Sequence, residues 1–230
     1  MQHTLDNPVW YALTGPQADV AIGHGLARHY PRDMAPFSAI AAPTGAAYAD
    51  LGVDLPHGLE ARLFRPHAES APEGWETISA RPIVQMAAAE VAAFPTSETE
   101  FVVLGPDDAA DMLALAEAAR PGPFGLRTSS LGAYLGVRRA GQLIAMGGER
   151  FRPPGFVELS GICTHPSVRG IGLGAAITAH LMRMVLERGE TPFLHVFPDN
   201  PAVALYARLG FRERARLFVL WHRRLIGRRP

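Results

Sequence analysis

The stretch Arg169-Gly170-Ile171-Gly172-Leu173-Gly174 follows an apolar segment, Phe156 to Thr164, and precedes a run without proline or internal glycine. His165-Pro166 ends the apolar segment because proline cannot continue a strand ladder. Apolar residues then recur at helical spacing from about Gly174 to Arg188, and Gly189 can cap the helix end. The sequence therefore predicts a strand, a glycine-rich loop and a helix, an order that holds phosphate groups at the positive end of a helix.

Three types of phosphate-binding loop lie between a strand and a helix, and the spacing of their characteristic residues distinguishes them. A P-loop requires Gly-Lys-Ser/Thr, and the chain contains no lysine. A dinucleotide fingerprint is closer, because Gly170-x-Gly172-x-x-Ala175 fits it and Glu190 lies twenty residues beyond Gly170. However, only 56 of the 230 residues follow Gly174, too few for the rest of such a domain and a substrate domain. The third pattern, Arg169-x-x-Gly172-x-Gly174, is the best fit.

This third pattern resembles the pyrophosphate loop of the GNAT-type N-acetyltransferases, Gln/Arg-x-x-Gly-x-Gly/Ala between a strand and a helix. A second motif strengthens the resemblance, because Asn200-Pro201-Ala202-Val203-Ala204-Leu205-Tyr206 and then Gly210-Phe211 come just after the next predicted strand, 193–197. In this superfamily an Asn-x-x-Ala-x-x-x-Tyr-like segment before Gly-Phe follows that strand. The resemblance covers roughly residues 101–221, the length of one such domain.

The resemblance implies an α/β (α+β) acyltransferase fold, with a mixed, mostly antiparallel central sheet flanked by helices. Residues 101–104 are expected to form its first strand, and Pro106-Asp107-Asp108 to begin a helix. Strands are expected at 131–138 and 143–150, joined as a hairpin, and an antiparallel strand at 216–222 closes the sheet. Two segments look more narrowly like the glycine N-acyltransferase branch, namely Met146 to Arg150 and Glu158 to Pro166.

Glu158 is the candidate general base. Acyl transfer from a thioester to an amine needs a neutral amine, a polarised carbonyl and a protonated leaving thiolate. Glu158 lies between Val157 and Leu159, so partial burial is expected to raise its pKa into the range useful for accepting a proton, directly or through water. It also matches a position where many family members carry glutamate. The alternative is an ion pair with Arg150 or Arg152.

Tyr206 is the candidate general acid. The resemblance implies that its hydroxyl lies near the cofactor sulfur, and a tyrosine pKa of about 10 keeps it protonated at neutral pH. The alternative is a helix tyrosine that packs its ring beside Leu205 and Leu209. Asn200 is expected to contact the pantetheine arm, to cap the helix after Pro201, or to do both.

The resemblance also implies a set of cofactor-binding residues. Backbone groups of the strand would meet the pantetheine arm, with an N–H near Ile162 or Cys163 polarising the thioester carbonyl, and Gly161 fits a β-bulge that parts this strand from its neighbour. The loop would hold the pyrophosphate, because glycine allows close backbone approach. The expected set is Ile162, Cys163, Thr164, Arg169, Gly170, Ile171, Gly172, Leu173, Gly174, Asn200 and Tyr206.

Composition restricts the compartment and the partners. Cys163 is the single cysteine, so an intramolecular disulfide is impossible and a reducing, cytoplasmic location is expected; a mid-strand position favours an inert core thiol. No metal-ligand spacing accompanies the nine histidines, among them His165 and His195, so no metal is expected. No apolar run reaches about 20 residues and no basic-then-apolar pattern opens the sequence, so neither a membrane span nor a signal peptide is expected. A bacterial source with GC-rich DNA is suggested by the abundance of Ala, Arg, Gly and Pro.

Charge is divided between the two parts of the chain. Residues 1–130 hold 7 arginines and 16 acids, whereas residues 131–230 hold 15 arginines and 6 acids. A positive C-terminal part suits an anionic cofactor, and attraction between the two parts is the alternative. The arginines at 223, 224, 228 and 229 lack interleaved aromatic residues, so a solvated tail is expected rather than a nucleic-acid site.

Residues 1–95 are expected to form an N-terminal region, and residues 96–230 the acetyltransferase domain. The N-terminal region has apparent strands at 59–64 and 83–86, and the alanine-rich segment 87–93 is a short helix or a linker. Proteins of the resembled branch often carry a degenerate copy of the fold there, which would complete the sheet or cover the acceptor pocket. From topology alone, that pocket is expected at Pro121 to Thr128, Tyr134 and the Glu149-Arg150 pair.

These observations predict an N-acetyltransferase that uses acetyl-CoA, or another acyl-CoA, as cosubstrate and acylates a primary amine on a small molecule or a peptide by direct attack. The alternative from another class is a non-catalytic coenzyme A binding module that acts through a protein partner. A nicotinamide-dependent enzyme is a third candidate. No nucleic-acid or membrane partner is expected.

Overall fold

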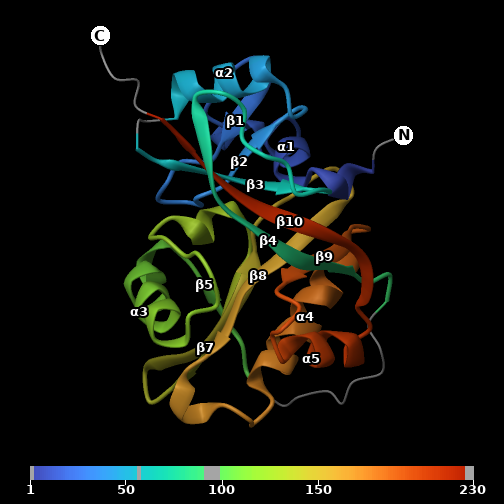
Figure 1. Ribbon diagram of the computed structural model, residues 1–230. Helices are drawn as coiled ribbons and strands as arrows, with labels where there is room; N and C mark the ends of the chain where they lie inside the picture. Colours follow the sequence, from blue (N-terminus) through green and yellow to red (C-terminus); the bar gives the residue numbers. More distant parts are fainter. Residues whose placement is uncertain (1–2, 56–57, 91–98, 226–230) are drawn as a thin grey trace.

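The computed structural model of the protein describes residues 3–55, 58–90 and 99–225, and its centre is an eight-stranded mixed sheet (Figure 1). Every neighbouring pair is antiparallel except β8 and β9, which are parallel. This confirms the predicted α/β fold. In spatial order the strands are β3 (Glu60–Arg65), β10 (Arg212–Arg224), β4 (Trp75–Ala87), β9 (Thr191–Val196), β8 (Phe156–Thr164), β7 (Gln142–Glu149), β6 (Tyr134–Arg139) and β5 (Val102–Leu104).

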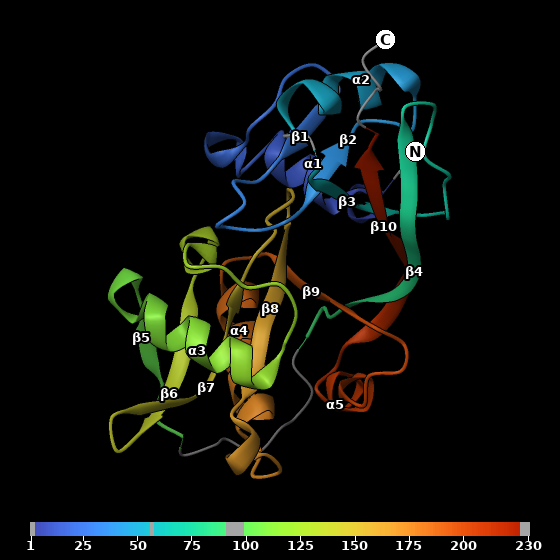
Figure 2. The ribbon, with the colours of Figure 1, turned by 60° about the vertical axis from the view of Figure 1, so that its left-hand side comes forward.

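Helices cover both faces of the sheet, as Figure 2 shows for α3 (Ala109–Ala119) and α4 (Leu173–Glu187) on either side of β7 and β8. Two adjacent glycines of β7 allow this close packing. A Cβ on Gly147 would meet Ile177 and Leu181 of α4, and one on Gly148 would lie 2.4 Å from the ring of Tyr134, which packs with α3. The short helix α5 (Ala202–Arg208) joins α4 on its face and adds to the same apolar core.

The predicted elements of the C-terminal part are present. The strand 156–164 has the predicted bounds, and the predicted hairpin is β6 and β7. Its turn places Ala140 at φ 48° and Gly141 at φ 82°, the pair of positive φ angles that a type I′ turn requires. Apolar residues at helical spacing form α4, whose buried side includes Ile177, Leu181 and Val185.

The N-terminal region completes the sheet. Its strand β4 lies between β9 and β10, and β3 forms the sheet edge beyond β10. The predicted strand 83–86 is only the buried end of β4, which begins at Trp75; residues 76–82 are largely exposed and so carry no apolar run. Ala88 to Glu90 are not helical, and the predicted boundary between residues 95 and 96 lies outside the described residues.

The other N-terminal elements form a cover above β3 and β10, as seen at the top of Figures 1 and 2. They are α1 (Pro8–Leu13), the two-stranded sheet of β1 (Ala27–His29) and β2 (Ser38–Ile40), and α2 (Gly45–Asp54). Two hydrogen bonds tie this cover to the loop after α3, since Arg127 N–H donates to the Asp33 carbonyl and the Thr128 hydroxyl to the Met34 carbonyl.

The expectation of a solvated arginine tail is wrong for Arg223 and Arg224. Both belong to β10, where Arg223 pairs with Glu60 and Glu76, and Arg224 donates to the Gly52 carbonyl. Arg228 and Arg229 lie outside the described residues. In the part of the chain described, no helix combines the length and apolar character that crossing a membrane requires. The cytoplasmic location stays a prediction.

Candidate active site

The site forms where β8 and β9 part. Their pairing ends at Glu158 opposite Phe193, and β8 then continues along β7 alone. The register of β8 and β7 shifts between Ser160 and Cys163, and Gly161 has a φ of 65°. This confirms the predicted β-bulge, although it lies in the ladder with β7, on the side away from β9. The opening leaves backbone groups of β8 without a partner strand.

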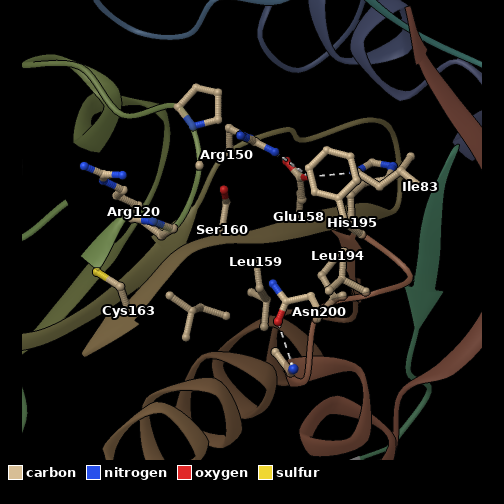
Figure 3. A pocket seen from close by; sticks show the side chains of 18 of the residues that line it. Ile83, Arg120, Arg150, Glu158, Leu159, Ser160, Cys163, Leu194, His195 and Asn200 are labelled. Atoms are coloured by element: carbon tan, nitrogen blue, oxygen red, sulfur yellow. Dashed lines mark hydrogen bonds and ion pairs between the residues drawn. The ribbon is translucent and has the colours of Figure 1, made fainter. Parts of the chain in front are cut away.

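A cavity of about 590 Å³ occupies this opening (Figure 3). Both parted strands line it, β8 with Leu159 to Thr164 and β9 with Leu194 to Val196. Tyr206 and Gly174 line it from the side of α4 and α5. Val157 and Leu159 pack toward α4, so Glu158 between them points to the other face of the sheet. On that side the cavity is also lined by Phe37, Arg150 and Pro121 to Pro123. A cavity of this volume is large enough for a small-molecule site.

The glycine loop borders a second hollow of about 430 Å³, lined by Arg169, Gly170, Gly172, Leu173 and Gly174 among others. Gly170 and Gly172 have φ angles of 84° and 89°, and a Cβ on either would project into open space. Gly172 precedes α4 and supplies no side-chain cap, so the first N–H groups of the helix are available to an anion. The exposed Arg169 side chain adds positive charge beside the hollow.

The other predicted cofactor residues fall into two groups. Ile162 and Thr164 line the cavity from β8, and Thr164 Oγ1 lies 3.7 Å from the position of a Cβ on Gly174. Asn200 Oδ1 accepts the N–H of Ala202, the first residue of α5, at 2.9 Å, and its amide nitrogen lies toward the cavity (Figure 3). Ile171, by contrast, is 56% exposed and lines neither hollow.

Tyr206 lines the cavity from α5. Its ring packs edge-on against Phe211, with the centroids 5.9 Å apart, and its hydroxyl makes no hydrogen bond with any described residue. Burial raises the pKa of Tyr206 to about 12. The hydroxyl is therefore protonated throughout the neutral range, as a proton donor must be.

Glu158 differs from its prediction. It is fully buried, and its carboxylate accepts two hydrogen bonds from Arg150, at 2.8 and 2.9 Å, and one from His195 Nδ1 at 2.7 Å (Figure 3). Burial alone would raise the pKa of Glu158, but Arg150 and His195 favour its ionised form and lower the pKa to about 2. The expectation of a raised pKa is wrong, and the ion pair with Arg150 that was the alternative is present.

His195 is a further polar residue of the site, for which the sequence predicts no role. It lies on β9 two residues after Phe193 and two before Phe197, so strand alternation turns it toward the face of Glu158. Burial lowers the pKa of His195, only partly opposed by Glu158, so the ring is neutral at pH 7. Its Nε2 then accepts a hydrogen bond from Gln85 at 3.0 Å. The sequence feature that could have indicated a role for His195 is its position inside the apolar segment 193–197.

Three further expectations can be compared with the structure. Cys163 is buried, and burial raises the pKa of its thiol to about 12, as expected of an inert core residue. Of the residues expected around the acceptor, Pro121 to Pro123 and Arg150 line the cavity, whereas Tyr134 and Glu149 do not. Within the described residues, no three His, Cys, Asp or Glu side chains gather closely enough to hold a metal ion.

Comparisons with known proteins agree with this fold. The FR47-like protein family model matches residues 134–219. A GNAT-family protein of known structure from Novosphingobium aromaticivorans is 36% identical over 98% of this chain and 100% of its own, with a TM-score of 0.86. A GCN5-related N-acetyltransferase from Kribbella flavida, 20% identical over 87% of this chain and 88% of its own, shares the fold with a TM-score of 0.57. No curated protein matches.

The strand opening, the glycine loop and this similarity define a class of protein: the chain belongs to the GNAT family of acetyltransferases. Members of this family use acetyl-CoA or another acyl-CoA, and the chain is accordingly an acyltransferase by family.

The Glu158 network predicts how stability depends on acid. Because the pKa of Glu158 is about 2 in the folded state and 4.5 when unperturbed, its stabilising contribution is present above pH 4.5 and is lost as pH falls toward 2. We expect Glu158→Gln to lose about 3–5 kcal/mol at pH 7, since Arg150 would keep a buried charge without its partner.

Urea unfolding of both proteins between pH 7 and pH 3 measures this. The variant should show a shallower loss of stability in acid, while the exposed Glu73→Gln control should follow the wild type. Equal pH slopes for Glu158→Gln and the wild type would contradict the network.

Proposed function

We propose that the protein transfers an acetyl or other acyl group from acyl-coenzyme A to a primary amine on a small molecule or a peptide. The observation that carries this proposal is the opening between β8 and β9 beside an uncapped glycine loop. A thioester cosubstrate supplies an activated acyl carbonyl and a thiolate leaving group. The segments Met146 to Arg150 and Glu158 to Pro166 remain the basis for proposing the glycine N-acyltransferase-like branch.

The residues of the cavity suit the binding of such a cosubstrate. Gly170, Gly172 and Gly174 permit backbone approach to a pyrophosphate, and the N-terminus of α4 with Arg169 provides positive charge. The unpaired edge of β8 around Ile162 can hydrogen-bond the amide groups of a pantetheine arm, as a neighbouring strand would. In this arrangement the thioester lies at the bulge, between the two faces of the sheet.

The transfer itself is a direct displacement. The amine nitrogen bonds to the acyl carbon, the carbon–sulfur bond breaks, one amine proton leaves, and the thiolate takes a proton from the Tyr206 hydroxyl. The products are an amide and free coenzyme A, and Tyr206 regains its proton from solvent. We assign Tyr206 to this role because the residue lines the cavity and its protonated hydroxyl has no hydrogen-bond partner among the described residues.

Glu158 takes a different role from the predicted one. A carboxylate with a pKa of about 2 accepts a proton poorly at neutral pH, because proton-transfer efficiency follows basicity. We therefore propose that Glu158 is a positioning residue, which holds Arg150 and His195 at the base of the opening, and that the amine proton leaves to water. In that case the neutral fraction of the acceptor amine limits the rate.

One prediction concerns cofactor binding. Gly174→Glu places a negative charge in the loop at a helical position with room for a Cβ, so the fold should survive while acetyl-CoA binding is lost. Gly45→Glu, at the first residue of α2 and with open space around it, is the matched control and should bind like the wild type.

Calorimetric titration with acetyl-CoA, and with NAD as a second ligand, measures both variants. Absence of acetyl-CoA binding to the wild-type protein, or preference for NAD, would contradict the proposal. Binding without turnover of any amine would instead favour the coenzyme A binding module. The hydrogen bonds of Glu158 to Arg150 and His195 are also compatible with that alternative, because they leave no free carboxylate to act as a base.

A second prediction concerns Tyr206. Tyr206→Phe should lower kcat by about 100-fold, because the thiolate would leave without a proton donor, and should leave acetyl-CoA affinity unchanged. Tyr11→Phe, on α1 away from the cavity, is the control and should keep the wild-type kcat. Release of free thiol measures turnover, and an unchanged kcat in Tyr206→Phe would exclude the acid role.

A third prediction concerns pH. Because Glu158 stays ionised and His195 neutral through the neutral range, log kcat/KM should rise with a slope of one up to the pKa of the acceptor amine. Two acceptors whose amine pKa values differ by about two units should therefore give profiles displaced by the same amount. An inflection at the same pH for both acceptors would instead reveal a protein base.

A further inference from the structure

The cavity extends from the opening across the sheet, on the face to which Glu158 points. Ala87 of β4 lies opposite Phe193, which pairs with Glu158, and counting in twos along β4 leads to Gln85, Ile83 and Arg81. Arg81 in turn lies opposite Val219 of β10, and Val219 opposite Phe64 of β3. Two residues further along these strands, Trp221 lies opposite Arg62. We name this part of the cavity the acceptor chamber; it is lined by Arg62, Phe64, Arg81, Ile83, Val219 and Trp221.

The charges around the cavity are unbalanced. Glu158 is the single acid among the lining residues, and Arg150 neutralises it. Arg81 and Arg120 line the cavity without an ion pair or a side-chain hydrogen bond to any described residue, and the Arg81 guanidinium lies 4.1 Å from the centre of the Phe197 ring. The lining therefore carries positive charge beyond what the pyrophosphate loop needs, and it favours an anionic occupant.

Arg62 is the second cation of the chamber and is only partly satisfied. Its guanidinium stacks 4.3 Å from the centre of the Trp221 ring, and its closest carboxylate, Glu60, lies 3.6 Å away and is shared with Arg223. The Nε atom of Arg62 is buried and has no hydrogen-bond partner among the described residues. A stacked guanidinium keeps its N–H edge free, and that edge fits a carboxylate in a bidentate manner.

The two arginines lie at a distance from the opening. Arg81 is on β4, two strands from β8, and Arg62 is on β3, four strands from β8. The sheet curves so that the Phe64 ring of β3 stacks on His195, with the ring centroids 4.3 Å apart, and Gln85 of β4 also contacts His195. Arg62 is two residues from Phe64 and Arg81 is four residues from Gln85, so at about 3.3 Å per residue their backbones lie roughly 7 and 13 Å along their strands from these contacts. The apolar side chains of Phe64, Ile83 and Val219 line the chamber between them. An anion held by Arg81 or Arg62 must therefore be several bonds from an amine placed at the opening.

We propose that the acceptor is a small amine that also carries a carboxylate several bonds from its nitrogen, with the carboxylate bound by Arg81 and Arg62 and its chain lying over the apolar floor of the chamber. This inference rests on the proposed acyl transfer at the opening. The shared chemistry is a terminal carboxylate, which can belong to an ω-amino acid or to a short peptide. A cationic far end would be repelled by both arginines, and an uncharged one would gain nothing from them.

Matched acceptors test the proposal by thiol release with acetyl-CoA. Pentylamine, 5-aminopentanoate and 1,5-diaminopentane have the same chain and differ in the charge of the far end. The expected result is a kcat/KM for 5-aminopentanoate at least tenfold above the other two and above glycine. Glycylglycine has the same spacing of amine and carboxylate and therefore distinguishes a peptide acceptor from a free ω-amino acid. A kcat/KM equal to that of 5-aminopentanoate supports a peptide, and a much lower kcat/KM supports a free ω-amino acid.

Substitutions locate the carboxylate. Arg81→Met and Arg62→Met should each bring the ratio of kcat/KM for 5-aminopentanoate over pentylamine toward one through a higher KM, and Arg81→Lys should retain part of it. Arg216→Met, exposed on β10 and outside the cavity, is the control and should keep the wild-type ratio. Thermal unfolding and acetyl-CoA titration of every variant confirm folding.

The outcomes separate this inference from the proposed function. Turnover that is equal or greater with pentylamine, 1,5-diaminopentane or glycine would overturn the carboxylate acceptor and leave acyl transfer in place. An unchanged ratio in both methionine variants would overturn the assignment to Arg81 and Arg62. Failure of every amine, with acetyl-CoA still bound, would overturn the proposed acyl transfer and this inference with it.

Discussion

The constraint on which the rest of the site depends is the separation of two parallel strands after a single buried carboxylate. β8 and β9 pair only as far as Glu158, and from there the two strands line a cavity instead of bonding to each other. At that point Glu158 binds Arg150 on one side and His195 on the other. Taking charges out of water is costly, so this arrangement is stable only because Arg150 binds both carboxylate oxygens and His195 donates to Oε1 as well.

The same network explains why the carboxylate is a poor proton acceptor. Burial opposes ionisation of Glu158, whereas the close guanidinium of Arg150 and the His195 N–H favour it, and the favourable interactions prevail. Glu158, which occupies the position expected of a general base, therefore stays ionised throughout the neutral pH range. In the proposed mechanism, catalysis then relies on the placement of the reactants and on a protonated Tyr206, with solvent receiving the amine proton.

The N-terminal region extends the sheet from the opening to the chamber that we propose for the acceptor. Because β4 inserts between β9 and β10, the sheet continues beyond the opening and its face becomes the floor of the acceptor chamber. The guanidinium groups of Arg62 and Arg81 lie over the aromatic rings of Trp221 and Phe197. Residues far apart in the chain, on β3, β4 and β10, thus share one surface with β9.

The sequence by itself determined the strand, the glycine loop, the helix and the hairpin, because these depend on local periodicity and on glycine conformations at neighbouring positions. The resemblance of the segment from Asn200 to Phe211 to a family motif also indicated Tyr206 and Asn200. Only the tertiary structure decided the pKa of Glu158, since the sign of the shift depends on whether Arg150 and His195 reach its carboxylate. The place of β4 and the gathering of Arg62 and Arg81 were decided there too, because antiparallel pairing between distant segments leaves no local pattern in the sequence.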